Sequence, residues 1–182
     1  MNTPVFRSPV TMPSATTPGS NVTLLDESSS TKFVVRAAAG TSARAVLAQS
    51  FGASRRVGGA LIVGIRPDEW FVLGSAADVA ERIDQIDSSA GHVSIVDWTH
   101  GRAQFRLGGP DAKNALEKVC SLDWSDAMMP NGAATSASVA KVACDIVRDD
   151  ADASLSYLVL CDRSFGQYLF EALLDAATEF QS

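Results

Sequence analysis

Residues able to act as nucleophiles, bases or metal ligands are few and widely spaced in this chain of 182 residues. A serine or cysteine nucleophile needs a histidine beside it, and the only histidines are His92 and His100. Cys120 lies on the apolar stripe of a predicted helix, whereas Cys144 and Cys161 lie inside strand patterns. Such positions are typical of core cysteines. The sequence therefore predicts no catalytic residue in this chain.

Neither a metal site nor a nucleotide site is predicted. His92, Asp97 and His100 could be imagined as metal ligands, but strand alternation points neighbouring side chains in opposite directions. The glycine pairs at 58–59 and 108–109 stand alone, without the longer pattern of a Walker loop or a dinucleotide-binding loop. We expect this chain to bind no cofactor and no metal.

The distribution of charge indicates a surface for a protein partner. Residues 31–75 contain six Lys or Arg and two acidic residues, whereas residues 76–182 contain eight basic and seventeen acidic residues. A nucleic-acid-binding protein would usually show a strongly basic face or domain, so nucleic acid is not an expected partner. Arg55 and Arg56, the only adjacent basic pair, are candidate contacts, with a solvated loop as the alternative. Trp98 and Trp124 are further interface candidates, with a core position or a stacking platform for a flat ring as alternatives.

Composition places the chain among ordinary soluble domains. Apolar residues make up 46% and charged residues 20%, and no apolar run approaches the roughly 20 residues of a membrane-spanning helix. Three cysteines leave one unpaired, and their spacings fit no zinc ribbon or Cys-x-x-Cys motif, so a cytoplasmic location is expected. Residues 1–30, with four prolines among polar residues, are predicted to be a disordered arm. Residues 31–182 are predicted to form a single folded domain.

The elements that must position these residues alternate between short strands and helices. The order is strand, helix, two strands, helix, two strands, helix, at least two strands, helix. This order predicts an α+β fold in which four helices cover one face of mainly antiparallel sheets. The predicted strands are 32–36, 60–65, 70–73, 93–96, 102–107, 139–147 and 157–161, and the predicted helices begin near residues 41, 75, 110 and 164.

Local patterns add two finer expectations. The period of two across residues 102–107 turns Arg102 and Arg106 outward. Ser164 and Gln167 form a predicted capping box for the last helix, whose apolar stripe begins at Phe165.

Three segments resemble the gamma subunits of heterotetrameric sarcosine oxidases. Residues 59–73, GALIVGIRPDEWFVL, are similar to a segment containing the phrase GP-(D/E)-EW-LL, with Arg66 in place of its glycine. Residues 96–112, VDWTHGRAQFRLGGPDA, are similar to D-x-S-H-x-R…L-x-G-P-x-A, although Trp98-Thr99 replaces a small residue and serine. Residues 162–165 resemble the ending v-x-R-S-F-A, with Gly166 at the alanine. The second phrase also resembles, more loosely, the folate-dependent aminomethyltransferases. The resemblance covers residues 31–180 and leaves the N-terminal arm without a counterpart.

The resemblance implies a fold similar to a single domain of the aminomethyltransferases and a non-catalytic role. Such a complex oxidatively demethylates sarcosine to glycine, releases hydrogen peroxide and passes the one-carbon unit to tetrahydrofolate. The resemblance further implies that FAD, FMN, NAD and tetrahydrofolate are held by partner subunits. The implied partners are large flavin-binding alpha and beta subunits and a small delta subunit.

Two other functions stay open. One is a free-standing folate-binding protein of one-carbon or iron–sulfur metabolism, although the motif K-G-C-Y-x-G-Q-E of that family does not occur in this chain. The other is a minimal aminomethyltransferase, which would need a substrate-facing aspartate in a ligand cavity.

Overall fold

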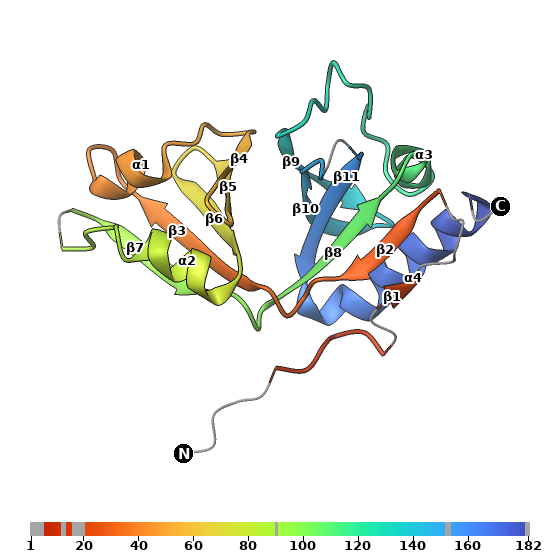
Figure 1. Ribbon diagram of the computed structural model, residues 1–182, viewed down its shortest axis with the longest axis horizontal. Coiled ribbons are helices and arrows are strands. Elements are labelled where there is room, and N and C mark those ends of the chain that lie inside the picture. Colours follow the sequence, from red (N-terminus) through yellow and green to blue (C-terminus); the bar gives the residue numbers. More distant parts are fainter. Residues whose placement is uncertain (1–5, 12–13, 16–20, 90, 152–153, 181–182) are drawn as a thin grey trace.

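Two antiparallel sheets stand against each other like the arms of a V, with the helices on their outer sides (Figure 1). The structure is a computed structural model that describes residues 6–11, 14–15, 21–89, 91–151 and 154–180. The predicted fold class, α+β with mainly antiparallel sheets and four helices, is confirmed.

The five-stranded sheet is built from consecutive residues of the chain. Its spatial order is β4 (Ser54–Val57), β5 (Ala60–Arg66), β6 (Glu69–Gly74), β3 (Thr31–Ala37) and β7 (Val93–Asp97). Helices α1 (Ser42–Leu47) and α2 (Ala76–Ile83) cover its outer face, because Leu47 and Val79 are buried against Ile62, Trp70 and Val72 of the sheet. Leaving aside the inserted β4, the chain follows the β-α-β-β-α-β order of ferredoxin-like units.

The six-stranded sheet collects strands from both ends of the chain. Its order is β1 (Ser14–Ala15), β2 (Thr23–Asp26), β8 (Arg102–Gly108), β11 (Ser156–Asp162), β10 (Val142–Arg148) and β9 (Ala134–Val139). Helices α3 (Ala112–Glu117) and α4 (Gly166–Ala177) lie on its outer side, and the short 3-10 turns η1 (Arg163–Phe165) and η2 (Thr178–Phe180) flank α4. Its core packs Phe105, Leu116 and Leu169 into one apolar cluster.

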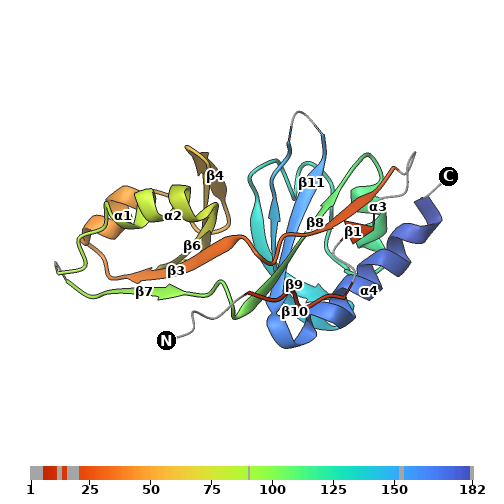
Figure 2. The same cartoon turned by 60° about the horizontal axis from the view of Figure 1, so that its bottom comes forward.

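Apolar side chains also join the inner faces of the two sheets. Val34, Val63 and Phe71 of the first sheet form one buried cluster with Val147 and Leu158 of the second. The layers are therefore helix, sheet, sheet, helix. Two segments connect the halves, one between β2 and β3 and one between β7 and β8, as Figure 2 shows. The start of β3 is joined to the β7–β8 connection where the Lys32 backbone N–H donates to Thr99 Oγ1 at 3.1 Å.

The folded part of the chain begins upstream of the predicted boundary at residue 31. Strand β2 pairs along its length with β8, and Val22 and Leu24 are buried. Further upstream, Val10 is buried and the Thr11 backbone N–H donates to Gln167 Oε1 at 2.9 Å. Residues 6–11, 14–15 and 21–30 are therefore part of the folded structure, although the prediction assigned them to a disordered arm; residues 1–5, 12–13 and 16–20 lie outside the described residues. Polar composition misled the prediction because backbone pairing can order such a segment with few apolar side chains.

A hairpin replaces the single strand predicted over residues 139–147. Strand β9 ends at Val139 and β10 begins at Val142. The two turn residues, Ala140 and Lys141, have positive φ angles of 47° and 69°. This backbone region favours Gly, Asn or Asp, and their absence removed the usual sequence signal for a turn.

The last helix also starts later than predicted. Asp162 caps the 3-10 turn η1 that precedes α4, because its Oδ1 accepts the Ser164 backbone N–H at 2.9 Å, and α4 itself begins at Gly166 without a side-chain cap. The Gln167 side chain instead accepts a hydrogen bond from the Thr11 backbone N–H of the N-terminal segment. Phe165 is 51% exposed, so its predicted burial is wrong and the buried stripe begins within α4.

Candidate functional site

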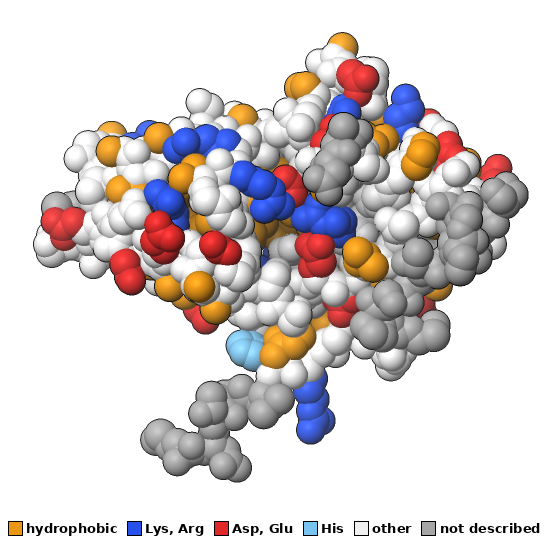
Figure 3. Space-filling view, in the orientation of Figure 1, with side chains coloured by type: hydrophobic (Ala, Val, Ile, Leu, Met, Phe, Trp, Pro, Cys, Tyr) orange, Lys and Arg blue, Asp and Glu red, His pale blue; other side chains and the backbone are white. Residues whose placement is uncertain are grey.

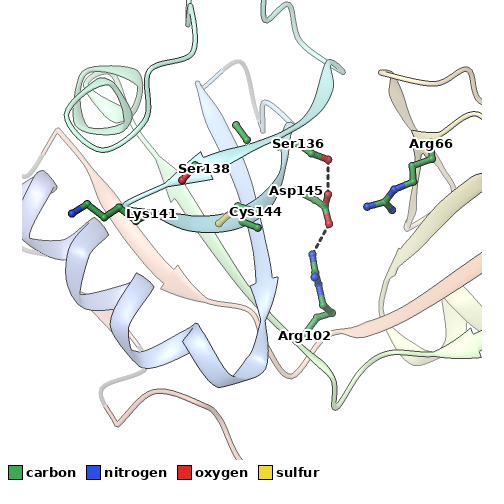
Figure 4. A pocket seen from close by; sticks show the side chains of 9 residues that line it. Arg66, Arg102, Ser136, Ser138, Lys141, Cys144 and Asp145 are labelled. Carbon is green, nitrogen blue, oxygen red and sulfur yellow. Dashed lines mark hydrogen bonds and ion pairs between the residues drawn. The ribbon is translucent and has the colours of Figure 1, made fainter.

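A cleft of about 460 Å³ opens between the turn that follows β5 and the strands β9 and β10 (Figure 4). Its charged lining comes from four elements. Arg66 ends β5, Arg102 begins β8, Lys141 lies in the β9–β10 turn and Asp145 lies within β10. The cleft exists because two sheets, distant in sequence, bring their inner faces together.

Asp145 anchors the wall of this cleft. The side chain is nearly buried, and its Oδ2 accepts a hydrogen bond from Arg102 Nη2 at 2.5 Å. Its Oδ1 accepts the Ser136 hydroxyl at 2.7 Å, so both carboxylate oxygens have a donor. Figure 4 shows these three side chains in a row, with Arg66 pointing toward them from the other sheet. Asp145 therefore serves as a fixed acceptor, and Lys141 has no ion-pair partner among the described residues.

A second polar cluster lies further along the same strands, around Asp149. This nearly buried carboxylate accepts from Arg56 Nη2 at 2.5 Å and from Arg106 Nη2 at 3.1 Å. Arg106 Nε also donates to Glu27 Oε1 at 2.6 Å. Burial opposes the charge of Arg106, but the hydrogen bonds and charges of Glu27 and Asp149 together outweigh it and raise the Arg106 pKa. In Figure 3, Lys and Arg side chains gather along the hollow between the two halves.

The two arginines of β8 do not face open solvent. Arg102 and Arg106 both have side chains that are only 17% exposed, because β8 lies in the six-stranded sheet with its polar face turned toward the five-stranded half. The prediction that both side chains point away from the helix-covered core is correct. The prediction that they point into solvent is wrong. Strand alternation reports which face a residue occupies, but not what covers that face.

Cys144 and Cys161, the two cysteines in strands, are unreactive in this environment. Burial raises the pKa of the Cys144 thiol to about 12 and that of Cys161 to about 11. A thiol must lose its proton to become a nucleophile, so these two groups stay unreactive near neutral pH. Cys120 is also free and buried. Among the described residues, no group of three His, Cys, Asp or Glu side chains is arranged to hold a metal ion.

The two candidate interface arginines have different surroundings. Arg55 is exposed, and its Nη2 donates to the Leu47 carbonyl oxygen at 3.1 Å. Arg56 is tied to Asp149 across the two halves and thereby compensates part of the charge asymmetry within the chain. Both line a shallow pocket with Asn131.

The two candidate interface tryptophans lie apart from these arginines. Trp98 is half-buried at the junction of the halves, where Arg102 lies over its ring at 5.6 Å from the centroid. Trp124 is 1% exposed and packs edge-on against Tyr157, with ring centroids 5.2 Å apart. Trp124 is therefore a core residue in this structure, and its candidacy as a surface contact is wrong, because an aromatic residue in a loop pattern gives no sign of its burial.

Sequence reasoning did not single out Asp145 or its partners Arg102 and Ser136 as a site. One signal was available. Asp145 interrupts the apolar strand VACDIVR, and a carboxylate in a buried strand requires a cation or hydrogen-bond donors. The identity of those donors depends on β8 and β9, which pairing rules alone did not supply.

None of the helices in the described part of the chain is long and apolar enough to cross a membrane.

Comparison with known proteins defines the class to which this fold and site belong. Residues 54–182 match the family model described as GCVT N-terminal domain, and the chain belongs to this family.

Two solved structures share the fold. One is a chain of the heterotetrameric sarcosine oxidase from Corynebacterium sp. U-96 in complex with pyrrole 2-carboxylate, with TM-score 0.73 and 22% identity. That match covers 88% of this chain and 86% of the other. The second is the glycine cleavage system aminomethyltransferase T from Bartonella henselae, with TM-score 0.65, 14% identity, and coverage of 89% of this chain and 50% of the other. At these identities the likeness establishes the fold alone. Among curated protein sequences, none matches this chain.

Proposed function

We propose that this chain is a non-catalytic, gamma-type subunit of a heterotetrameric sarcosine oxidase and that it docks onto flavin-bearing subunits. The supporting observation is the extent of the structural match. The chain spans 86% of the length of a chain from the heterotetramer, but only 50% of the aminomethyltransferase. The match over most of a chain of the heterotetramer supports a role like that of a subunit of such a complex.

The chemistry of the described residues fits this role. The thiols of Cys144 and Cys161 stay protonated, and both oxygens of Asp145 are engaged. In the described part of the chain, no hydrogen bond joins a serine or cysteine side chain to His92 or His100. In this proposal FAD, FMN, NAD and tetrahydrofolate are bound by the alpha, beta and delta subunits, and the complex performs the demethylation of sarcosine.

Purification of the chain alone and after co-expression with the other three subunits tests the proposal. The isolated chain should be colourless and should release no peroxide with sarcosine, whereas co-expression should give a stable complex that contains it. Flavin absorbance or peroxide formation by the chain alone would refute the non-catalytic role. Tight binding of tetrahydrofolate by the isolated chain, with no complex formed, would favour the free-standing folate-binding protein.

Arg55 is the better of the two predicted arginine contacts to test. Arg55→Glu should slow assembly and reduce its salt dependence, because a charge at the rim of an interface acts mainly on association. Arg55→Lys is the matched control, since it keeps the charge. Arg56 should be left unchanged, because Arg56→Glu would place a second carboxylate against the nearly buried Asp149 and disturb the fold. Equal assembly rates for both variants would remove Arg55 from the interface.

A further inference from the structure

We infer that the edge strand β9 is a docking site for an extended, acidic segment of a partner subunit, which adds a strand to the six-stranded sheet. This inference rests on the proposed role as a docking subunit and names the surface and the type of partner. Its basis is the backbone of β9, the way this chain already uses one end of that edge, and the charge of the cleft beside it.

The backbone of β9 presents unpaired groups on its outer side. Arg148 N–H donates to the Ala133 carbonyl at 2.9 Å, which fixes the alternation of the β9–β10 ladder. Backbone groups that face the paired strand recur at every second residue, starting here from Ala133. The residues that face β10 are therefore Thr135, Ala137 and Val139. The N–H and C=O groups of Ser136 and Ser138 therefore point away from the sheet, and no backbone partner for them occurs among the described residues.

The chain itself shows that this edge accepts extended backbone. At the start of β9 the Ala134 N–H donates to the Gly52 carbonyl at 2.9 Å, and Ala53 forms an antiparallel bridge with Ala133. The segment at residues 52–54 thus covers the first outward-facing position. The next two, Ser136 and Ser138, are exposed and continue the same row.

Strand β9 also lacks the usual protection of an edge. Native edge strands are commonly blocked by Pro, by a charged side chain or by a bulge. The sequence of β9 is ATSASV, and its register with β10 runs without a shift. A free edge of this kind is the surface used in peptide recognition by strand addition, where main-chain hydrogen bonds supply affinity and flanking pockets supply specificity.

The adjacent cleft specifies the charge of the segment. Ser136, Ser138, Arg66 and Lys141 line the same cleft, and its one carboxylate, Asp145, already has two donors. Alternate residues of an added strand point to the same face of the sheet, so one or two carboxylate side chains of that strand would face these cations. An acidic segment therefore fits better than a neutral or basic one.

The decisive comparison uses Ser138→Pro and Ser138→Ala in the complex with the large subunits. Proline removes only the outward N–H, which takes no part in the ladder with β10, and its ring would also obstruct an added strand. Alanine keeps the N–H and removes the hydroxyl. We expect Ser138→Pro to weaken assembly by about tenfold or more, while Ser138→Ala assembles within about twofold of wild type. Equal assembly by both variants would overturn the inference, while a wild-type chain that forms no complex would refute the proposed function itself.

Hydrogen exchange on the wild-type complex guards against a folding defect in the proline variant. The amides of Ser136 and Ser138 should exchange slowly in the complex and rapidly in the free chain; unchanged exchange would contradict strand addition. Lys141→Glu should slow assembly several-fold, with Lys113→Glu on α3 as the control, and equal rates would exclude an acidic segment. If the free chain instead forms dimers that Ser138→Pro dissociates, the edge pairs with a second copy and the partner assignment is wrong.

Discussion

The five-stranded and six-stranded halves differ in how the chain assembles them. The first takes all its strands from residues 31–97, and β5 and β6 form a hairpin joined by a tight turn. The second pairs β2 with β8, which lies about eighty residues further along the chain. Pairing between distant segments requires the closure of a long loop and leaves little local signal. The comparison teaches that the pairing of β2 with a distant strand leaves no local signal, whereas the β5–β6 hairpin could be predicted from its own residues.

The largest effect on stability is expected for a buried residue of β2. Leu24 is 1% exposed in the core of the six-stranded half, while its neighbour Leu25 points away and is 38% exposed. Leu24→Ala should reduce the free energy of unfolding by about 2–5 kcal/mol, as for other buried leucines. Leu25→Ala is the matched control and should cost less than about 1 kcal/mol. Urea titration of both variants measures the difference, and equal effects would mean that β2 contributes no core residue.

Lys32 tests the connection between the two halves. This lysine is 2% exposed, and its Nζ donates to the carbonyl oxygens of Ser28 at 2.8 Å and Ser30 at 2.6 Å. Burial lowers the pKa of Lys32 to about 8 from an ordinary value of 10.5. Below pH 8 both folded and unfolded states carry the proton, so the full cost of the buried charge is present. Between pH 8 and 10.5 the unfolded state binds more protons, and stability should rise by up to about 3 kcal/mol from this group.

The check is the free energy of unfolding of the wild type and Lys32→Met, measured at pH 7.5 and at pH 10. As the pH rises, the free energy of unfolding of the wild type should increase relative to that of Lys32→Met. A difference that is constant with pH would show that Lys32 is charged throughout this range in the folded state.

The smallest expected effect concerns the N-terminal segment on α4. A Cβ atom at Gly166 would lie 2.8 Å from Pro9 Cβ and 3.1 Å from Ala103 Cβ, closer than packed carbon atoms allow. Gly166→Ala should therefore cost about 1–2 kcal/mol, because the overpacking outweighs the better helix propensity of alanine. Adding Pro9→Gly should remove at least half of that cost in a double-mutant cycle. Additive effects would mean that the segment at residues 6–11 does not rest on α4 in solution.

Gly166 also connects the resemblance to the structure. The phrase that residues 162–166 resemble has alanine where this chain has Gly166. The absence of a side chain at Gly166 is what leaves room for Pro9. Gly166 and the segment at residues 6–11 therefore pack in direct contact.

The sequence by itself determined the fold class, the β5–β6 hairpin and the Ser75 cap of α2, whose hydroxyl accepts the Asp78 N–H at 3.2 Å. Each depends on residues only a few positions apart, so local pattern was sufficient. The sequence also placed Ala103, Phe105 and Leu107 correctly in the core.

Only the tertiary structure decided the surroundings of the polar residues. It buried Trp124, turned Arg102 toward Asp145 and Arg106 toward Asp149, and left the outer edge of β9 open. Periodicity gives the face of a strand on which a side chain lies. What covers that face depends on how the other sheet packs against it. The cationic cleft and the open edge are products of that packing, because their residues come from strands that meet only after the chain has folded.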